Sequence, residues 1–272
     1  GDAVPVDFVS VLSGLVWGLG YFGMPQVLLR FMAIRDEKEL DLSRRIAAVW
    51  VVISMTVAVC IGMIGYSVSK AGNIPVLEGS ASETVIVQIS NLLSTFGLFP
   101  AIVAGCILAG ILAATMSTAD SQLLAASSAF SENLLQDVFG IKLTAKQTML
   151  VARLTVIAIA VIAVFLARDP NSSVFQIVSF AWAGFGASFG PVIILSLFWK
   201  RTTYKGAIAG VVGGALVDVL WMLLLAETGI YELLPGFIAG GLSCIIVSLI
   251  DKKPSAEVAA LFEKASKITD ED

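Results

Sequence analysis

The sequence predicts an all-α polytopic membrane protein. Of its 272 residues, 57% are hydrophobic and 14% are charged, and the mean hydropathy is +0.92. Such a composition suits lipid rather than water as the solvent. About seven stretches are each long enough to cross the hydrocarbon core, which takes about 20 mainly apolar residues of helix.

The predicted spans follow one another with short connections. The first covers residues 8–34 and the second residues 46–69. Residues 84–119 carry no charge and exceed one span, so Gly97 and Pro100 are expected to separate a short outer helix from a third span that continues to about Phe130. The remaining spans are expected at residues 149–167, 174–199, 206–226 and 233–250. Residues 1–251 then form the transmembrane domain, and residues 252–272 a cytoplasmic tail.

The cationic residues predict the orientation. Seven spans place consecutive loops on alternate faces, and 15 of the 17 Lys and Arg residues fall on one face. Only Lys70 and Arg168 fall on the other. Since short loops rich in Lys and Arg stay in the cytoplasm, the C-terminus is expected inside and the N-terminus outside.

Composition also excludes several chemistries. The chain has no histidine, which removes Ser-His-Asp and Cys-His catalysis and every His-ligated metal. Cys60, Cys106 and Cys244 each lie in an apolar run without CxxC spacing, so buried thiols are expected rather than a disulfide or zinc site. The chain begins without Met or a signal sequence, and we expect it to be a fragment or the second part of a split protein.

The first span carries its own helix breakers. Gly18, Gly20, Gly23 and Pro25 interrupt a run without charge between Asp7 and Arg30. A broken helix at membrane depth is tolerated where it is packed in protein or faces a watery cavity, and transporters bind substrate at such breaks. The alternative is that the glycines only permit close packing. The same glycines match GxGxxG, but a membrane span lacks the strand and acidic residue that a nucleotide site requires.

The third span contains a group of oxygen ligands. Ala114 lies three and four residues before Ser117 and Thr118, so its carbonyl lies on the same flank as their hydroxyls. These oxygens suit part of a shell around a small hard cation. The competing interpretation, which the residues alone favour, is that the hydroxyls bond the carbonyl four residues back.

Two acidic residues and a small-residue segment complete the pattern. Asp120, inside a span, is expected to have a functional role, facing a pore or pairing between helices. Asp218, near Trp221, is interpreted as an interhelical contact. Residues 180–191, FAWAGFGASFGP, predict tight helix packing, and the alternative for Trp182 is that it lines a cavity.

Together these stretches resemble the sodium:solute symporter family, and most closely its sodium/proline symporters. The resemblance rests on GLGYFGMPQVLLRFMAI at 18–34, ILAATMSTADSQLL at 111–124, SFAWAGFGASFGP at 179–191 and SLFWKRTTYKGAIAGVVGG at 196–214. It extends in order over nearly the whole chain. It implies the second half of a LeuT-like inverted-repeat transporter, with the last two spans as accessory helices.

The resemblance also implies site residues. Ala114, Ser117 and Thr118 correspond to sodium ligands, which reverses the preference for a purely structural role. Trp17, Tyr21 and Pro25 correspond to residues of the proline site on the broken helix. The implied activity is sodium-coupled proline uptake across the bacterial inner membrane, with no bond made or broken. The implied partners are proline, membrane lipid and an N-terminal half that supplies the remaining contacts, and nucleic acid is not expected.

Other functions fit the same pattern less well. The solute could instead be pantothenate or another amino acid. A symporter-like sensory module is a second alternative, but the polar tail is too short for a signalling domain. An intramembrane protease fails because histidine is absent, and Asp120 and Asp218 lack the contexts of an aspartyl type.

Overall fold

The computed structural model describes residues 7–36, 38–168 and 173–268, and their regular structure is helical. The chain divides into two units. Unit 1 comprises residues 1–32 and 177–272, and unit 2 comprises residues 33–176. The first six residues and the last four of the predicted tail, residues 269–272, lie outside the described parts.

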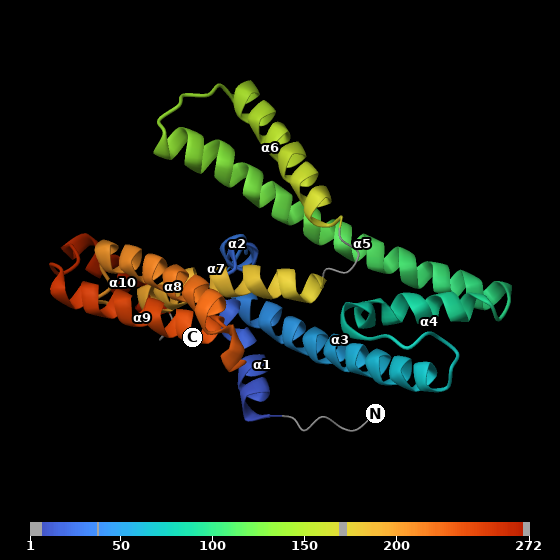
Figure 1. Ribbon diagram of the computed structural model, residues 1–272. Coiled ribbons are helices and arrows are strands. Elements are labelled where there is room, and N and C mark those ends of the chain that lie inside the picture. The colour runs from blue at the N-terminus through green and yellow to red at the C-terminus, as the bar shows by residue number, and fades with distance from the viewer. Residues whose placement is uncertain (1–6, 37, 169–172, 269–272) are drawn as a thin grey trace. The chain divides into compact units, whose positions relative to one another are not determined.

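Unit 1 combines the two ends of the chain (Figure 1). Its elements are α1 (Phe8–Gly20), α2 (Pro25–Met32), most of α7 (Val174–Phe198), α8 (Tyr204–Leu224), the 3-10 turn η3 (Ala226–Thr228), α9 (Leu233–Ile250) and α10 (Ala256–Ile268). Its buried apolar core is centred on Val16, Ala183, Ala187 and Leu233.

Helices α8 and α9 lie side by side because small residues recur every four positions on both (Figure 1). A Cβ atom added to Gly210 would come within 2.9 Å of the Cys244 Cβ atom, and one added to Gly240 within 2.8 Å of the Ala187 carbonyl on α7. Close backbone approach of this kind is how membrane helices gain packing energy without a hydrophobic driving force. Of the small residues expected to pack on α7, Ala183, Gly186, Ala187 and Gly190 are buried, and Gly184 is partly buried.

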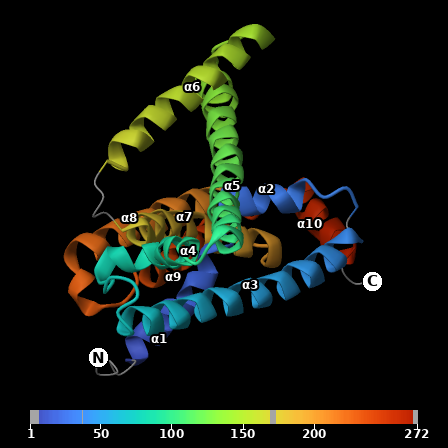
Figure 2. The same cartoon turned by 90° about the vertical axis from the view of Figure 1, so that its right-hand side faces the viewer.

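Unit 2 consists of long helices joined by short turns. Its elements are α3 (Glu39–Lys70), the 3-10 helix η1 (Gly79–Thr84), α4 (Val85–Ser94), α5 (Leu98–Ser128), a π-helical continuation η2 (Ala129–Val138) and α6 (Ala145–Leu166). Helix α6 turns back against α5 and η2 (Figure 2).

Local sequence sets the boundaries in unit 2. Gly97 adopts φ 120°, a conformation open to glycine, and so turns the chain between α4 and α5 as expected from Gly97 and Pro100. Thr144 begins α6 through a capping box, in which its hydroxyl accepts from the Gln147 backbone N–H and the Gln147 side chain accepts from the Thr144 N–H.

The predicted spans agree with the helices. Six described helices are long and apolar enough to cross a membrane, and the α1–α2 pair, bent by 43°, makes a seventh if it is counted as one span. The third span is longer than expected because η2 extends the α5 helix to Val138. The polar tail contains α10.

The expectation of three buried thiols is wrong. Only Cys244 is buried, whereas Cys60 and Cys106 are exposed on α3 and α5. An apolar run in a membrane span does not require burial within protein, because the surrounding lipid is itself an apolar solvent.

Candidate functional site

The interruption between α1 and α2 is the most unusual backbone feature of unit 1. Helix α1 ends at Gly20, and α2 starts at Pro25 after a turn in which the Gly23 N–H donates to the Gly20 carbonyl at 3.0 Å. Pro25 has no N–H, so the Tyr21 carbonyl loses its normal helical donor. The sequence GLGYFGMP therefore breaks the helix where the glycines and proline predicted a break.

Glycines at this break allow α7 to approach the backbone. A Cβ atom on Gly20 would collide with the Trp182 ring, and one on Gly23 would lie 2.8 Å from the Gly186 Cα atom. In the other direction, a Cβ atom on Gly186 would lie 2.7 Å from the Gly20 Cα atom. Gly20 and Gly23 thus serve both of the roles that the sequence left open, because they flank the helix break and also permit close helix packing.

Aromatic rings gather beside the break. The Trp17 ring stacks with those of Trp182 and Tyr231, whose centroids lie 5.6 Å and 5.7 Å from its own and whose planes are nearly parallel to it. The Tyr21 ring meets Trp182 edge to face at 4.7 Å. The Trp182 indole N–H donates to the Trp17 carbonyl at 3.0 Å, which fixes the indole against α1. These four residues are named the aromatic cluster.

The turn before α9 supports the cluster. The Tyr231 hydroxyl donates to the Ser179 carbonyl at 2.7 Å, and the Tyr231 N–H donates to the Ser13 hydroxyl at 3.2 Å. Burial raises the pKa of Tyr231 above its ordinary value, so the phenol remains a donor at physiological pH. Sequence reasoning gave Tyr231 no role because it comes more than 200 residues after Trp17. The sequence of residues 180–191 predicts packing for Trp182, and its contacts with Trp17 and Tyr21 agree with that prediction.

The predicted substrate residues occupy different environments. Trp17 is half-buried and stacks against two other rings, those of Trp182 and Tyr231. Tyr21 is 47% exposed and offers ring and hydroxyl to a neighbour. Pro25 is exposed at the first residue of α2 and has no described contact with the aromatic cluster. Of the three, Tyr21 has the most accessible chemistry.

The predicted sodium residues lie together on α5 in unit 2. Ala114, Ser117 and Thr118 are all exposed on that helix. The Thr118 hydroxyl donates to the Ala114 carbonyl at 3.2 Å, which is the bond to the fourth residue back that the residues alone favoured. The two oxygens are therefore neighbours on one face, and the carbonyl keeps a second lone pair. Asp120, on the same helix, is also exposed.

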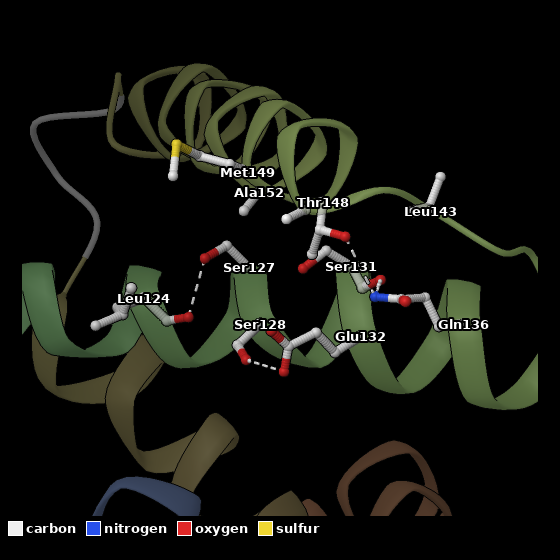
Figure 3. A pocket seen from close by; sticks show the side chains of 11 residues that line it. Leu124, Ser127, Ser128, Ser131, Glu132, Gln136, Leu143, Thr148, Met149 and Ala152 are labelled. Carbon is white, nitrogen blue, oxygen red and sulfur yellow. Dashed lines mark hydrogen bonds between the residues drawn. The ribbon is translucent and has the colours of Figure 1, made fainter.

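A cavity with both polar and apolar walls lies between α5–η2 and α6, and the sequence did not predict it. It has a volume of about 560 Å³ and is lined in part by Ser127, Ser131 and Thr148 (Figure 3). The Gln136 amide donates to the Thr148 hydroxyl and the Ser131 carbonyl at 3.4 Å and 3.3 Å. π-Helical segments often occur at functional sites, and the polar run SSAFSE at 127–132 is the sequence signal for this cavity.

Comparison with models of protein families gives a match that includes most of the features described above. The model of the sodium:solute symporter family matches residues 3–214, which include the helix break, α5, α7 and the start of α8. The chain belongs to the sodium:solute symporter family. This confirms the resemblance seen in the sequence motifs, and it makes the chain a member of a transporter family. Together with the apolar helices, it identifies a multi-pass membrane protein.

The relatives of this chain include proteins named as proline transporters and sodium/proline symporters. The chain is 40% identical over 262 residues to the osmoregulated proline transporter OpuE of Bacillus subtilis, covering 96% of this chain and 52% of the relative. It is 40% identical over 254 residues to the high-affinity proline transporter PutP of the same organism, covering 93% and 52%. It is 38% identical over 263 residues to the sodium/proline symporter of Escherichia coli, covering 96% and 51%.

The chain thus spans about half the length of these curated relatives. No solved structure matches it.

Proposed function

We propose that this chain is the C-terminal part of a transporter that couples sodium entry to proline uptake across the bacterial plasma membrane. Family membership supports sodium coupling, and the names of the relatives support proline. The observation that carries the proposal is the helix break beside the aromatic cluster, since transporters bind solute at discontinuous membrane helices. Nothing in this activity makes or breaks a covalent bond.

In the proposed substrate site, Tyr21 contacts proline directly. Its half-exposed ring offers apolar area to the pyrrolidine ring, and its hydroxyl offers a polar partner. Trp17 holds the wall of the site by stacking with Trp182 and Tyr231. Pro25 keeps the helix broken, because it cannot donate the hydrogen bond that would continue α1 into α2.

In the proposed sodium site, Ala114 offers its carbonyl, and Ser117 and Thr118 offer their hydroxyls. The 3.2 Å separation between the Thr118 hydroxyl and the Ala114 carbonyl suits neighbouring ligands. A cation bound by oxygens at about 2.4 Å places adjacent oxygens about 3.4 Å apart in an octahedral shell. On ion binding, the Thr118 hydroxyl would turn its lone pair toward the ion and release the carbonyl.

An N-terminal half would supply the remaining ligands in this proposal. Three oxygens from one helix are half or fewer of those that a hard cation takes. Sodium binding would favour the state that accepts proline, and each ligand would raise the affinity of the other by the same factor. The excess of Lys and Arg in alternate loops supports a cytoplasmic C-terminus.

Reconstitution tests the proposal. The 272 residues alone in proteoliposomes should show no sodium-driven proline uptake, because each site would have only one wall. Co-reconstitution with the N-terminal half of a relative such as the E. coli symporter should restore saturable uptake that requires a sodium gradient. Excess pantothenate and other amino acids should compete poorly. Sodium-dependent uptake by the chain alone would contradict the proposal that each site is shared with an N-terminal half. If another solute competed more strongly than unlabelled proline, that solute would be the substrate.

A further inference from the structure

Asp218 is the most anomalous polar residue in the described parts of the chain. It lies within the membrane-spanning helix α8, and its exposed fraction is 1%. Its Oδ1 atom is buried and has no hydrogen-bond partner, the one such side-chain oxygen or nitrogen found among the described residues. The expected position of Asp218 between helices is confirmed. That position alone does not explain why a carboxyl group is buried there without a hydrogen-bond partner for Oδ1.

Small residues on neighbouring helices leave room for the Asp218 carboxyl without pairing with it. On α9, a Cβ atom added to Gly236 would lie 3.1 Å from the Asp218 Cβ atom. On α7, one added to Gly184 would lie 3.9 Å from the Asp218 Oδ2 atom. The Ser188 hydroxyl on α7 donates to the Gly184 carbonyl at 2.6 Å, so its proton is already engaged.

The charged and titratable groups near Asp218 do not include a cation. They are Glu232 and Tyr231, both in the turn before α9, and Glu232 acts on Asp218 as a like charge. In the described part of the chain Asp218 forms no ion pair. An unpaired ionised carboxylate in such a place would carry its full desolvation cost, and a nearby second carboxylate would add to that cost.

A cleft opens beside the carboxyl. It has a volume of about 250 Å³, and its walls include the rings of Phe180, Phe185 and Phe189 with Ala215 and Val219. A metal ion such as calcium or sodium takes several oxygen ligands, and these walls offer almost none besides Asp218. A proton needs only one oxygen. The chemistry of the cleft therefore selects a proton over a metal ion.

We propose that Asp218 is a proton-binding site, in which the carboxyl is protonated when α7, α8 and α9 are packed and exchanges its proton through the phenylalanine-lined cleft. Asp218 lies six residues before Leu224, the last residue of α8, or about 9 Å along the helix axis. That short depth brings the cleft near one end of the span, where water is available. All the residues involved belong to unit 1.

Infrared spectroscopy tests the protonation state directly and needs no transport. The 272-residue chain in lipid nanodiscs at pH 7 should show the carbonyl stretch of a protonated carboxyl, with its shift in deuterium oxide. Asp218→Asn should remove that band. The matched control Glu227→Gln changes an exposed acid in η3 and should leave it. Absence of the band, or its survival in Asp218→Asn, would overturn the proposal.

Thiol labelling checks that the variants are folded and adds a second test. Cys244 is buried where α9 meets Gly210 of α8, and Cys60→Ser with Cys106→Ser leaves it as the one thiol of the chain. At pH 7 a neutral maleimide should leave Cys244 unlabelled in the parent, in Asp218→Asn and in the apolar variant Asp218→Val.

Raising the pH should release the proton and loosen this packing. Labelling of the parent relative to Asp218→Asn should then rise, by up to about tenfold per pH unit, because one proton separates the packed and loosened states. The ratio corrects for the titration of the thiol itself. An equal pH dependence in the two proteins would overturn the proposal.

Discussion

Unit 1 and unit 2 present their predicted binding residues in opposite ways. In unit 1, Trp17 stacks with two other rings, and the glycines of the break lie against the Trp182 ring and the α7 backbone. In unit 2, Ala114, Ser117 and Thr118 are exposed along α5, and their described hydrogen bonds stay within that helix. The proposed substrate wall is therefore organised by contacts within the unit, whereas the proposed sodium ligands are organised by helical periodicity alone.

This difference separates two kinds of pre-organisation. A helix fixes the spacing of its own oxygens without tertiary contacts, so three ligands can be ready before any other element approaches. An aromatic wall requires several elements to meet, and its geometry changes when any one of them moves. We expect substitutions in unit 2 to affect ion affinity with little effect on folding, and substitutions in unit 1 to affect both.

The largest expected effect is on sodium. In the co-reconstituted transporter, Ser117→Ala with Thr118→Ala should raise the sodium concentration for half-maximal uptake by on the order of 100-fold, since each bond to a charged group contributes about 1.5 kcal/mol. This concentration is measured by following proline uptake as sodium is varied, and the abundance of the double variant should equal that of the parent. The matched control is Thr115→Ala, whose hydroxyl bonds the Ile111 carbonyl on the same helix. An unaltered sodium requirement in the double variant would remove the site from α5.

The second effect concerns the packing of the break in unit 1. Gly20→Ala should destabilise the unit by about 1–3 kcal/mol because the new methyl group displaces the Trp182 ring. Thermal unfolding in detergent and a change in tryptophan fluorescence report it. Gly14→Ala is the control, since a Cβ atom there would meet nothing within 4 Å. Equal tolerance of both changes would mean that the break is less tightly packed than its contacts imply.

A third, smaller effect separates substrate contact from packing. Tyr21→Ala should weaken proline affinity by about tenfold through loss of ring area and hydroxyl, while sodium binding in the absence of proline stays nearly intact. Trp17→Ala should instead lower stability, because the Trp17 ring stacks with those of Trp182 and Tyr231. Binding of each ligand, measured by calorimetry, distinguishes the two. If Tyr21→Ala reduced sodium binding equally, the ring would have a folding role.

The smallest effect is a pH dependence at the start of α7. The carboxylate of Glu83 accepts from the Ser173 hydroxyl at 2.6 Å and from the Val174 and Phe175 N–H groups at 3.1 Å and 3.3 Å. Chiefly through the Ser173 bond, the pKa of Glu83 is lowered from its ordinary 4.5. Its stabilising contribution is therefore complete above about pH 4.5 and is lost as the pH falls through the lowered pKa.

Hydrogen exchange at Val174 and Phe175 measures this contribution. Protection factors there should fall slightly between pH 6 and pH 3 in the parent, and they should be low and flat in Glu83→Gln. Glu78→Gln changes an exposed acid nearby and should behave as the parent does. Identical profiles in all three proteins would show that the hydrogen bonds to the Glu83 carboxylate do not stabilise the start of α7.

The sequence by itself determined the class of the protein and the course of the chain. Twenty-residue apolar runs predict spans because the thickness of the bilayer sets their length, and the described helices agree. Gly20, Gly23 and Pro25 predicted the broken first span, since their effects on the backbone are local. The grouping of Ala114, Ser117 and Thr118 followed likewise from helical spacing within a few residues.

Only the tertiary structure decided which distant residues meet. Tyr231 joins Trp17 across more than 200 residues, and Asp218 is buried without a partner because Gly184 and Gly236 come from two other helices. Burial of a thiol could not be read from apolar sequence either, since Cys60 and Cys244 both sit in apolar spans but only Cys244 faces another helix. Hydropathy reports preference for an apolar solvent, and both lipid and protein satisfy it. Which of them surrounds a given side chain depends on how the helices pack.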